Sequence, residues 1–367
     1  HPMFTLFKLL WLRVQRPDVW QRARWFYCFE DLFQQSLGVE PAISWPLAGR
    51  TMLFNLRTHA WDETILARNG LDPSCLARPL PSGTVVGQVA PGLARDLGLG
   101  KGAIVVAGGH DQPCGALGAG VTSPGRAAYA IGITPAFPQP VFAKDLFESN
   151  LCTYDYTLAG MYTTVAFSLT GGNLLRWFRD EWGQEEVAEA RRLGLNPYEL
   201  LLKQMAEEPT DLLVLPYFTP SGTPYFDPHV RGAILGLRLT TRRADVLRAL
   251  LEGVTFEMRL NVDIMARSGI PIAELVAVGG GARSRTWLQL KADILNRPIR
   301  TVAVNEASCL GVAMLAAAAH LGEEVARLAQ EWVQVTGALT PDPRRAAYYQ
   351  ERFADYLRLY PTLRNLM

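Results

Sequence analysis

One acidic residue, Asp111, stands directly after the predicted end of a strand. The apolar run at 103–107 is typical of a buried parallel strand, and it stops at Gly108-Gly109-His110. Ligands of open α/β sheets bind at the carboxyl ends of strands, and two glycines leave room beside a carboxylate. Asp111 is therefore a candidate general base. It could also cap a helix that begins near Pro113, and the residue types leave both interpretations open.

A second predicted strand, at 275–278, ends in the glycine cluster Gly279-Gly280-Gly281-Ala282. Backbone in such a turn can approach a flat or charged ligand closely, and the helix predicted from about Arg285 presents free N–H groups. The pattern also resembles a dinucleotide fingerprint, with Ser284 in place of the third glycine and Glu306 placed to meet a ribose. Spacing alone leaves a nucleotide site and a purely structural turn as alternatives.

Strands that alternate with helices must position these two turns. The predicted strands lie at 84–89, 103–107, 128–134, 162–168, 212–215, 275–278 and 299–304. The predicted helices lie at 242–267, 285–295 and 308–319, with one more from about Asn173. This alternation predicts an α/β protein with mainly parallel sheets. Residues 1 to about 70 have helical spacing, and their aromatic side chains are predicted to pack in a core; among them are Trp11, Trp25, Phe29 and Phe33.

Composition restricts the class of protein further. The 367 residues suit about two domains, and 49% hydrophobic with 19% charged residues excludes a disordered chain. A net charge of +1 offers no general attraction for nucleic acid or membranes, so neither is an expected partner. Five scattered cysteines favour reduced thiols in a cytoplasmic protein. The chain has no Walker-type motif and no zinc-binding His-Glu-x-x-His, and no metal ligands are predicted.

Longer segments around both turns closely resemble the two diagnostic segments of the FGGY family of carbohydrate kinases. These segments are GGHDQPCGALGAG at 108–120 and VGGGARSRTWLQLKADIL at 278–295. Further segments resemble the family in the family's order, at 1–12, 48–54, 170–178, 227–237, 251–257 and 306–316. The resemblance covers about the first 320 residues, and two spaced motifs in order are more specific than either alone.

The resemblance implies an α/β fold of two actin-like (ribonuclease H-like) domains that flank a cleft, the first of them incomplete. It divides the chain into the remainder of a substrate-side domain at 1–120 and a nucleotide-side domain at 121–322. A helical C-terminal tail at 323–367 follows. The implied partner is a small sugar or polyol, the implied cofactors are ATP and Mg2+, and a homodimer is compatible with the family.

The resemblance also implies roles for individual residues. Asp111 falls on the family's catalytic base, and Gln112 and His110 are expected to bind substrate. The residues implied to bind the nucleotide are Gly132 and Thr134 at the phosphates and Gly279, Gly280, Gly281, Ala282 and Ser284 at the adenine. Phosphoryl transfer depends mainly on positioning and charge neutralisation, and one carboxylate suffices to deprotonate the nucleophile.

Three departures from the family pattern leave more than one hypothesis about the activity of this chain. Ile133 occupies the first hydroxyl position of the phosphate loop, and Ser44-Trp45-Pro46 stands where an Asp and a Ser are common. No segment with the family's Asp-x-Gly-Thr phosphate motif precedes His1. The first hypothesis is an active ATP-dependent carbohydrate kinase, and the alternative is a truncated, inactive relative that binds nucleotide or sugar. A nicotinamide-dependent oxidoreductase would depend on the pattern from Gly279 to Glu306 alone.

Overall fold

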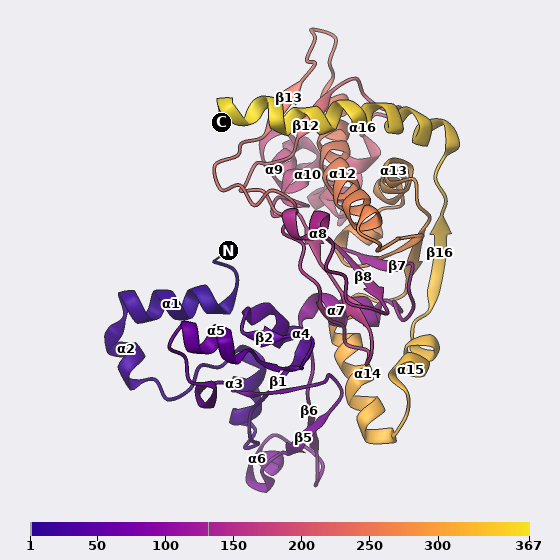
Figure 1. Cartoon of the computed structure of the whole chain (residues 1–367). Coiled ribbons are helices and arrows are strands. Elements are labelled where there is room, and N and C mark those ends of the chain that lie inside the picture. The colour runs from indigo at the N-terminus through magenta and orange to yellow at the C-terminus, as the bar shows by residue number, and fades with distance from the viewer. Residues whose placement is uncertain (1, 131) are drawn as a thin grey trace.

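A computed structural model of the chain describes residues 2–130 and 132–367. His1, in the predicted family segment 1–12, and Ile131, in the predicted strand 128–134, lie outside these ranges. The N-terminal helices and short strands form one part of the molecule, drawn in indigo and purple, and a larger part holds the main sheet and the long helices (Figure 1). Helix α7 (Asp111–Gly118) lies where the two parts meet.

The N-terminal part contains short helices and three small two-stranded sheets. Its helices are α1 (Thr5–Gln15), α2 (Pro17–Arg22), α3 (Phe29–Ser36), α4 (Trp45–Ala48), α5 (Glu63–Arg68) and α6 (Pro91–Asp96), with 3-10 turns η1 (Gly49–Thr51) and η2 (Pro73–Cys75). Its strands are β1 (Ala42–Ser44), β2 (Phe54–Asn55), β3 (Ala60–Trp61), β4 (Arg78–Leu80), β5 (Val85–Gln88) and β6 (Ile104–Val106). β6 pairs antiparallel with β5, so the prediction of a parallel strand at 103–107 is wrong: β6 is only half-buried, in a small sheet of its own.

The predicted aromatic core of the N-terminal helices is wrong in part: Trp20 and Phe26 pack against buried leucines, but other aromatic side chains are exposed. Trp11, Phe29 and Phe33 have exposed fractions of 59%, 91% and 65%. Helix α1 buries Leu6 and Leu9 instead. The buried face of helix α3 is polar and carries Asp31 and Gln34. Their side chains accept hydrogen bonds from the backbone N–H groups of Cys28 and Ala42.

The main sheet supplies the strand end that carries the second glycine turn, after β14. Its strands are β7 (Arg126–Tyr129), β8 (Gly132–Phe137), β9 (Tyr154–Asp155), β10 (Tyr162–Thr163), β11 (Ala166–Phe167), β14 (Glu274–Ala277), β15 (Ile299–Val302) and β16 (Val335–Leu339). They follow the order β16-β15-β14-β7-β8-β10-β9, with β11 beside β8. β7, β14 and β15 are parallel, and Ala277 lies opposite Tyr129. The turn after β14 therefore lies beside the connection from β7 to β8.

Helices and one hairpin complete the larger part. The helices are α8 (Lys144–Glu148), α9 (Asn173–Trp182), α10 (Gln184–Leu193), α11 (Pro197–Lys203), α12 (Arg243–Arg267), α13 (Arg285–Leu295), α14 (Ala307–Leu321), α15 (Val325–Trp332) and α16 (Pro343–Leu363), with 3-10 turns η3 (Gly280–Arg283) and η4 (Arg364–Leu366). The hairpin pairs β12 (Leu213–Leu215) with β13 (Ala233–Leu235). The tail predicted as helical also contains strand β16, because the sheet edge at β15 offers backbone groups for it to pair with. Among the described helices, none is long and apolar enough to cross a bilayer.

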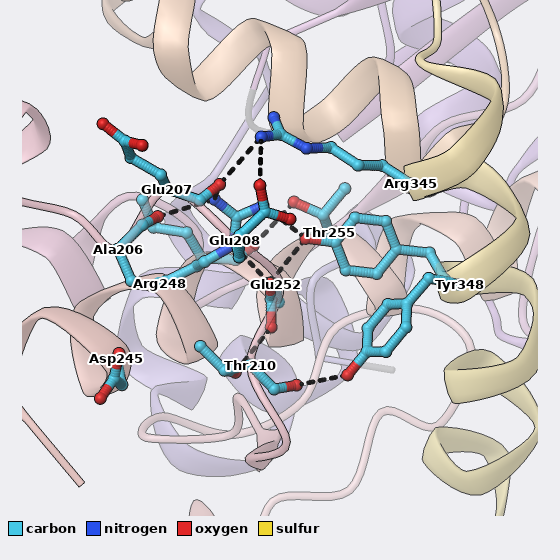
Figure 2. Close-up of polar contacts among 12 residues, drawn as sticks. Ala206, Glu207, Glu208, Thr210, Asp245, Arg248, Glu252, Thr255, Arg345 and Tyr348 are labelled. Atoms are coloured by element: carbon cyan, nitrogen blue, oxygen red, sulfur yellow. Dashed lines mark hydrogen bonds and ion pairs between the residues drawn. The ribbon is translucent and has the colours of Figure 1, made fainter.

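A buried polar cluster joins α12 to α16 and to the loop before β12 (Figure 2). Arg248 donates to Glu252 over 2.8 Å and to the carbonyl groups of Ala206 and Glu207. The second oxygen of Glu252 accepts the Thr210 hydroxyl at 3.0 Å. From α16, the Tyr349 hydroxyl donates to Glu252 over 2.6 Å. Each charge in the cluster is paired and hydrogen-bonded, which is the condition for burying charges at acceptable cost.

A second buried carboxyl on α12, Glu257, has no such pairing. The residue is fully buried, and neither carboxyl oxygen makes a hydrogen bond. Burial raises the pKa of Glu257 to about 8, and a nearby Ser168 hydroxyl lowers it by less. The folded protein therefore keeps a proton there up to about pH 8, whereas the unfolded chain releases it near its ordinary pKa of 4.5.

Replacing Glu257 by glutamine is expected to stabilise the protein at pH 8 and to leave it nearly unchanged at pH 4.5. Because the folded-state pKa is raised, wild-type stability is lost as pH rises from about 4.5 to 8, by up to about 1.4 kcal/mol per pH unit. A glutamine has no proton to release. Urea unfolding at several pH values measures this difference, with Glu351→Gln on the exposed face of α16 as control. Parallel pH profiles for wild type and Glu257→Gln would contradict a buried neutral carboxyl.

Candidate active site

Helix α7 begins at Asp111, two residues before the expected start at Pro113. His110 is the N-cap residue, and no side chain caps the helix, so the capping interpretation of Asp111 is wrong. The Asp111 side chain is 68% exposed. A carboxylate in the first turn is favoured by the helix dipole. Its oxygens are therefore held beside a helix N-terminus and stay available to a ligand.

A very close crossing of α7 and α14 fixes the position of Asp111. A Cβ at Gly118 would lie 1.9 Å from the Ala307 carbonyl oxygen, and one at Gly311 would lie 2.0 Å from the Cys114 carbonyl oxygen. Only glycine fits at either position. At the same crossing the Ser308 hydroxyl donates to the Asp111 carbonyl over 2.9 Å. The start of α7 is thereby tied to the start of α14.

A small cavity of about 140 Å³ brings several predicted site residues together. Asp111 and Gln112 reach it from α7, Gly132 and Thr134 from β8, and Gly279 from the turn after β14. It is also lined by Glu306 and Ser308 at the start of α14. The parallel pairing of β7 with β14 and the α7–α14 crossing produce this arrangement, although its members come from distant parts of the chain.

Three of these residues are held tightly by their neighbours. Thr134 is 2% exposed and lies opposite Ala128 in the sheet. A Cβ at Gly132 would lie 2.1 Å from the Ala166 carbonyl oxygen, so no side chain fits there. Gln112 directs its amide nitrogen to within 3.3 Å of an Asp111 carboxylate oxygen.

His110, the other residue expected to bind substrate, does not line this cavity. Its buried Nδ1 lies 3.3 Å from an Asp111 oxygen but makes no hydrogen bond, and its ring packs edge-on against Tyr154. Burial lowers the pKa of His110 to about 4, although Asp111 opposes the shift. The imidazole is therefore neutral near pH 7 and supplies no positive charge beside Asp111.

The glycine turn after β14 borders three further cavities. Gly279 has a φ of 77°, a conformation that favours glycine, and η3 follows it. Gly280 and Gly281 line two adjoining cavities of about 260 and 620 Å³, together with Gly171-Gly172. Ser284 lines the larger of the two, but its hydroxyl also caps α13 by accepting from the Trp287 N–H. Ala282 instead lines a third cavity of about 960 Å³.

Glu30 supports the site in a way that sequence reasoning missed. One carboxylate oxygen accepts the Gly108 N–H at 2.8 Å, and the other accepts the Ser44 hydroxyl at 2.7 Å and its N–H at 3.1 Å. Burial raises the pKa of Glu30 despite these three hydrogen bonds. The residue ties α3 to the glycines that lead to Asp111. No local sequence signal shows this, because Glu30 and Gly108 are far apart in the chain.

Glu30→Gln is expected to lower the free energy of unfolding by about 1–3 kcal/mol, because the amide nitrogen would face an N–H donor and leave it unsatisfied. Chemical denaturation measures the change. Glu40→Gln is the matched control, since Glu40 is exposed. Equal midpoints for the two variants would show that Glu30 does not hold the turn.

The fold and the site together define a class of protein. Helix α7, where the two α/β parts meet, brings a carboxylate to a cavity lined by glycines of a mixed sheet, as in carbohydrate kinases of the actin-like, ribonuclease H-like fold. The structure superimposes on the crystal structure of xylulose kinase from Rhodospirillum rubrum with a TM-score of 0.87 and 26% identity, over 100% of this chain and 73% of that one. The predicted α/β, actin-like fold class is confirmed, but the prediction of mainly parallel sheets is wrong, because most strand pairs of the described residues are antiparallel.

Sequence comparison then identifies the family. The chain matches the N-terminal domain of the FGGY family of carbohydrate kinases over residues 1–118 and the C-terminal domain over residues 136–320. It is 28% identical to a xylulose kinase of Staphylococcus epidermidis over 99% of this chain, and 28% identical to a gluconokinase of Bacillus licheniformis over 100%. It spans 72% of the length of each relative. The chain belongs to the FGGY family of ATP-dependent carbohydrate kinases, as its motifs predicted.

Proposed function

We propose that this protein transfers the terminal phosphoryl group of Mg-ATP to a hydroxyl group of a sugar or polyol beside Asp111. The observation that carries the proposal is the cavity shared by Asp111, Gly132, Thr134 and Gly279. It places an accessible carboxylate next to the turns that the family resemblance assigns to the nucleotide. Phosphoryl transfer needs this proximity of base, acceptor and donor more than it needs covalent catalysis.

The residues of the chain have separate tasks in this proposal. An Asp111 carboxylate oxygen accepts the proton of the substrate hydroxyl as the hydroxyl oxygen attacks phosphorus. Gln112 binds the substrate and orients the carboxylate through its 3.3 Å contact. At Gly279 the space that a side chain would fill is open, so the backbone there can meet a phosphate oxygen, and Gly132 lines the same cavity from β8. Mg-ATP, when bound, supplies the phosphoryl group and neutralises its charge.

The residues of the site fit a magnesium nucleotide. Asp111 and Glu306 both line the same cavity. Within the described ranges, no group of three or more acidic, histidine or cysteine residues forms a metal cage. Mg2+ is commonly held by one or two carboxylates together with substrate phosphates, so Glu306 would hold the ion and leave Asp111 free to accept the proton. Because Glu306 lines the cavity that also contains Asp111, we assign it to this site and not to the ribose of a dinucleotide.

We also propose the domain division 1–120, 121–322 and 323–367. The family matches at 1–118 and 136–320 support the first two boundaries. The last segment packs on the nucleotide side: β16 extends the main sheet, and Tyr349 of α16 joins the buried cluster on α12.

A phosphorylation screen tests the proposed function. The purified chain is incubated with Mg-ATP and a panel of xylulose, gluconate and glycerol, which represent neutral ketoses, sugar acids and polyols, and ADP release is measured. Release that depends on one sugar supports the proposal and names the substrate class. Tight Mg-ATP binding without turnover on a wide panel would favour the inactive relative. Binding of NADH but not of Mg-ATP would favour an oxidoreductase.

A further inference from the structure

A buried lysine on α13, Lys291, has no partner of opposite charge. The residue is 4% exposed, and its ammonium nitrogen lies 4.1 Å from the Tyr129 ring centroid and 4.6 Å from that of Trp287. Across residues 2–130 and 132–367, no carboxylate forms an ion pair with it. Cation–π contacts offset part of the cost of burying an ammonium group, but they do not neutralise its charge.

The ammonium group of Lys291 faces the glycine turn. A Cβ at Gly281 would lie 3.5 Å from the Lys291 nitrogen, so the absence of a side chain there leaves the nitrogen access to the turn. Lys291 lines the cavity of about 260 Å³ together with Gly171-Gly172 and Gly279–Gly281. This cavity shares Ala130, Val278 and Gly279 with the cavity that contains Asp111. Lys291 and Asp111 therefore line two adjoining cavities that share Gly279.

We propose that Lys291 is a nucleotide-binding residue whose ammonium group pairs with the phosphate chain of the nucleotide, so that the Gly279–Gly281 turn, implied by the resemblance to bind the adenine, also contacts a phosphate group. The inference rests on the proposed function and adds to it a charged contact that the glycine turns alone do not supply. A phosphate oxygen is the expected ligand because the site lacks a negative charge, and a charge-assisted hydrogen bond is strongest where water is excluded. A phosphate chain bound at Gly279 would also extend towards Asp111.

The charge of Lys291 makes nucleotide affinity depend on pH. Burial lowers the pKa of Lys291 to about 8 and is the sole cause of the shift. The groups that face it are the Tyr129 ring from β7, the apolar Val254 and Met258 from α12, and Trp287 on its own helix. The pKa of Tyr129 is raised by burial and by Glu257, so that phenol stays neutral. Lys291 is therefore charged below about pH 8, and affinity is expected to fall as pH rises through that value.

Calorimetric titration with Mg-ADP, AMP and adenosine tests the proposal. Lys291→Met is expected to weaken Mg-ADP and AMP by about 10- to 100-fold, the effect of losing one charge-assisted hydrogen bond, and to change adenosine binding by less than about twofold. Lys291→Arg should restore most of the loss. Wild-type affinity for Mg-ADP should fall between pH 7 and 9, whereas that of Lys291→Met should stay level. Lys101→Met, at an exposed position, is the matched control.

Each outcome of this experiment supports or contradicts a phosphate-binding role for Lys291. If wild type binds Mg-ADP and Lys291→Met binds it equally well with the same pH dependence, Lys291 is only a packing residue and the inference fails alone. Equal losses for adenosine and Mg-ADP would also overturn it, because they indicate a distorted pocket. If wild type binds neither Mg-ADP nor Mg-ATP, the proposed function fails as well. Should Lys291→Met not fold by circular dichroism, Lys291→Gln takes its place.

Discussion

Asp111→Asn is expected to lower kcat by about 10²- to 10⁴-fold, the usual contribution of a general base, and to leave Mg-ADP affinity unchanged. Asparagine keeps the shape of the side chain but cannot accept the hydroxyl proton. The fold should persist, because the Asp111 side chain is exposed and caps no helix. Loss of its charge at the start of α7 costs only about 0.3–1 kcal/mol.

Steady-state kinetics with the sugar identified by the screen measure this effect. Asp96→Asn is the control, since Asp96 is exposed and lies at the end of α6, away from the cavity. If Asp111→Asn retained near-normal turnover while folded, Asp111 would not be the base. A loss of kcat accompanied by an equal loss of Mg-ADP affinity would point instead to a damaged nucleotide site.

Gly311→Ala is expected to destabilise the protein by about 3 kcal/mol or more, at the upper end for overpacking a core. The new methyl group would meet the Cys114 carbonyl oxygen at 2.0 Å, and a backbone atom cannot rotate away as a side chain can. Helices α7 and α14 would have to separate. Because Asp111 starts α7 and Glu306 precedes α14, we also expect kcat to fall in any fraction that folds.

Denaturant unfolding measures the loss of stability. Gly92→Ala is the matched control: its Cβ would meet nothing within 4 Å, and alanine inside α6 stabilises a helix by roughly 0.5–1 kcal/mol relative to glycine. Equal midpoints for Gly311→Ala and wild type would mean that α7 and α14 do not approach as closely as described.

The sequence predicted features whose causes are local. The apolar run before Gly279 forms strand β14, and α12 and α13 lie within about a residue of their predicted bounds. These elements depend on periodicity and on glycine at strand ends. The single strand predicted at 128–134 is wrong, because that range contains parts of two antiparallel strands, β7 and β8. The family motifs added Asp111 and the glycine turns as site candidates, and the structure brings Asp111, Gln112, Gly132, Thr134 and Gly279 to one cavity.

Predictions failed where the outcome depended on distant partners. The run at 103–107 has the composition of a parallel strand, but among the described residues its only strand partner is β5, which runs antiparallel. Phe29 and Phe33 have helical spacing, yet α3 buries its opposite, polar face. Strand β16 forms inside a helical tail because β15 has a free edge. Composition does not encode which neighbour a segment meets.

The sequence by itself determined the family, the α/β alternation and the residue types at the two turns, because motifs, periodicity and turn chemistry are read along the chain. Only the tertiary structure decided that Ser308 bonds the backbone of Asp111, that Glu30 holds Gly108, and that Lys291 is buried beside Gly281 without an anion. The physical reason is that such contacts depend on strand order and on the distance at which two helices cross. Both are set by packing between segments that are far apart in the sequence.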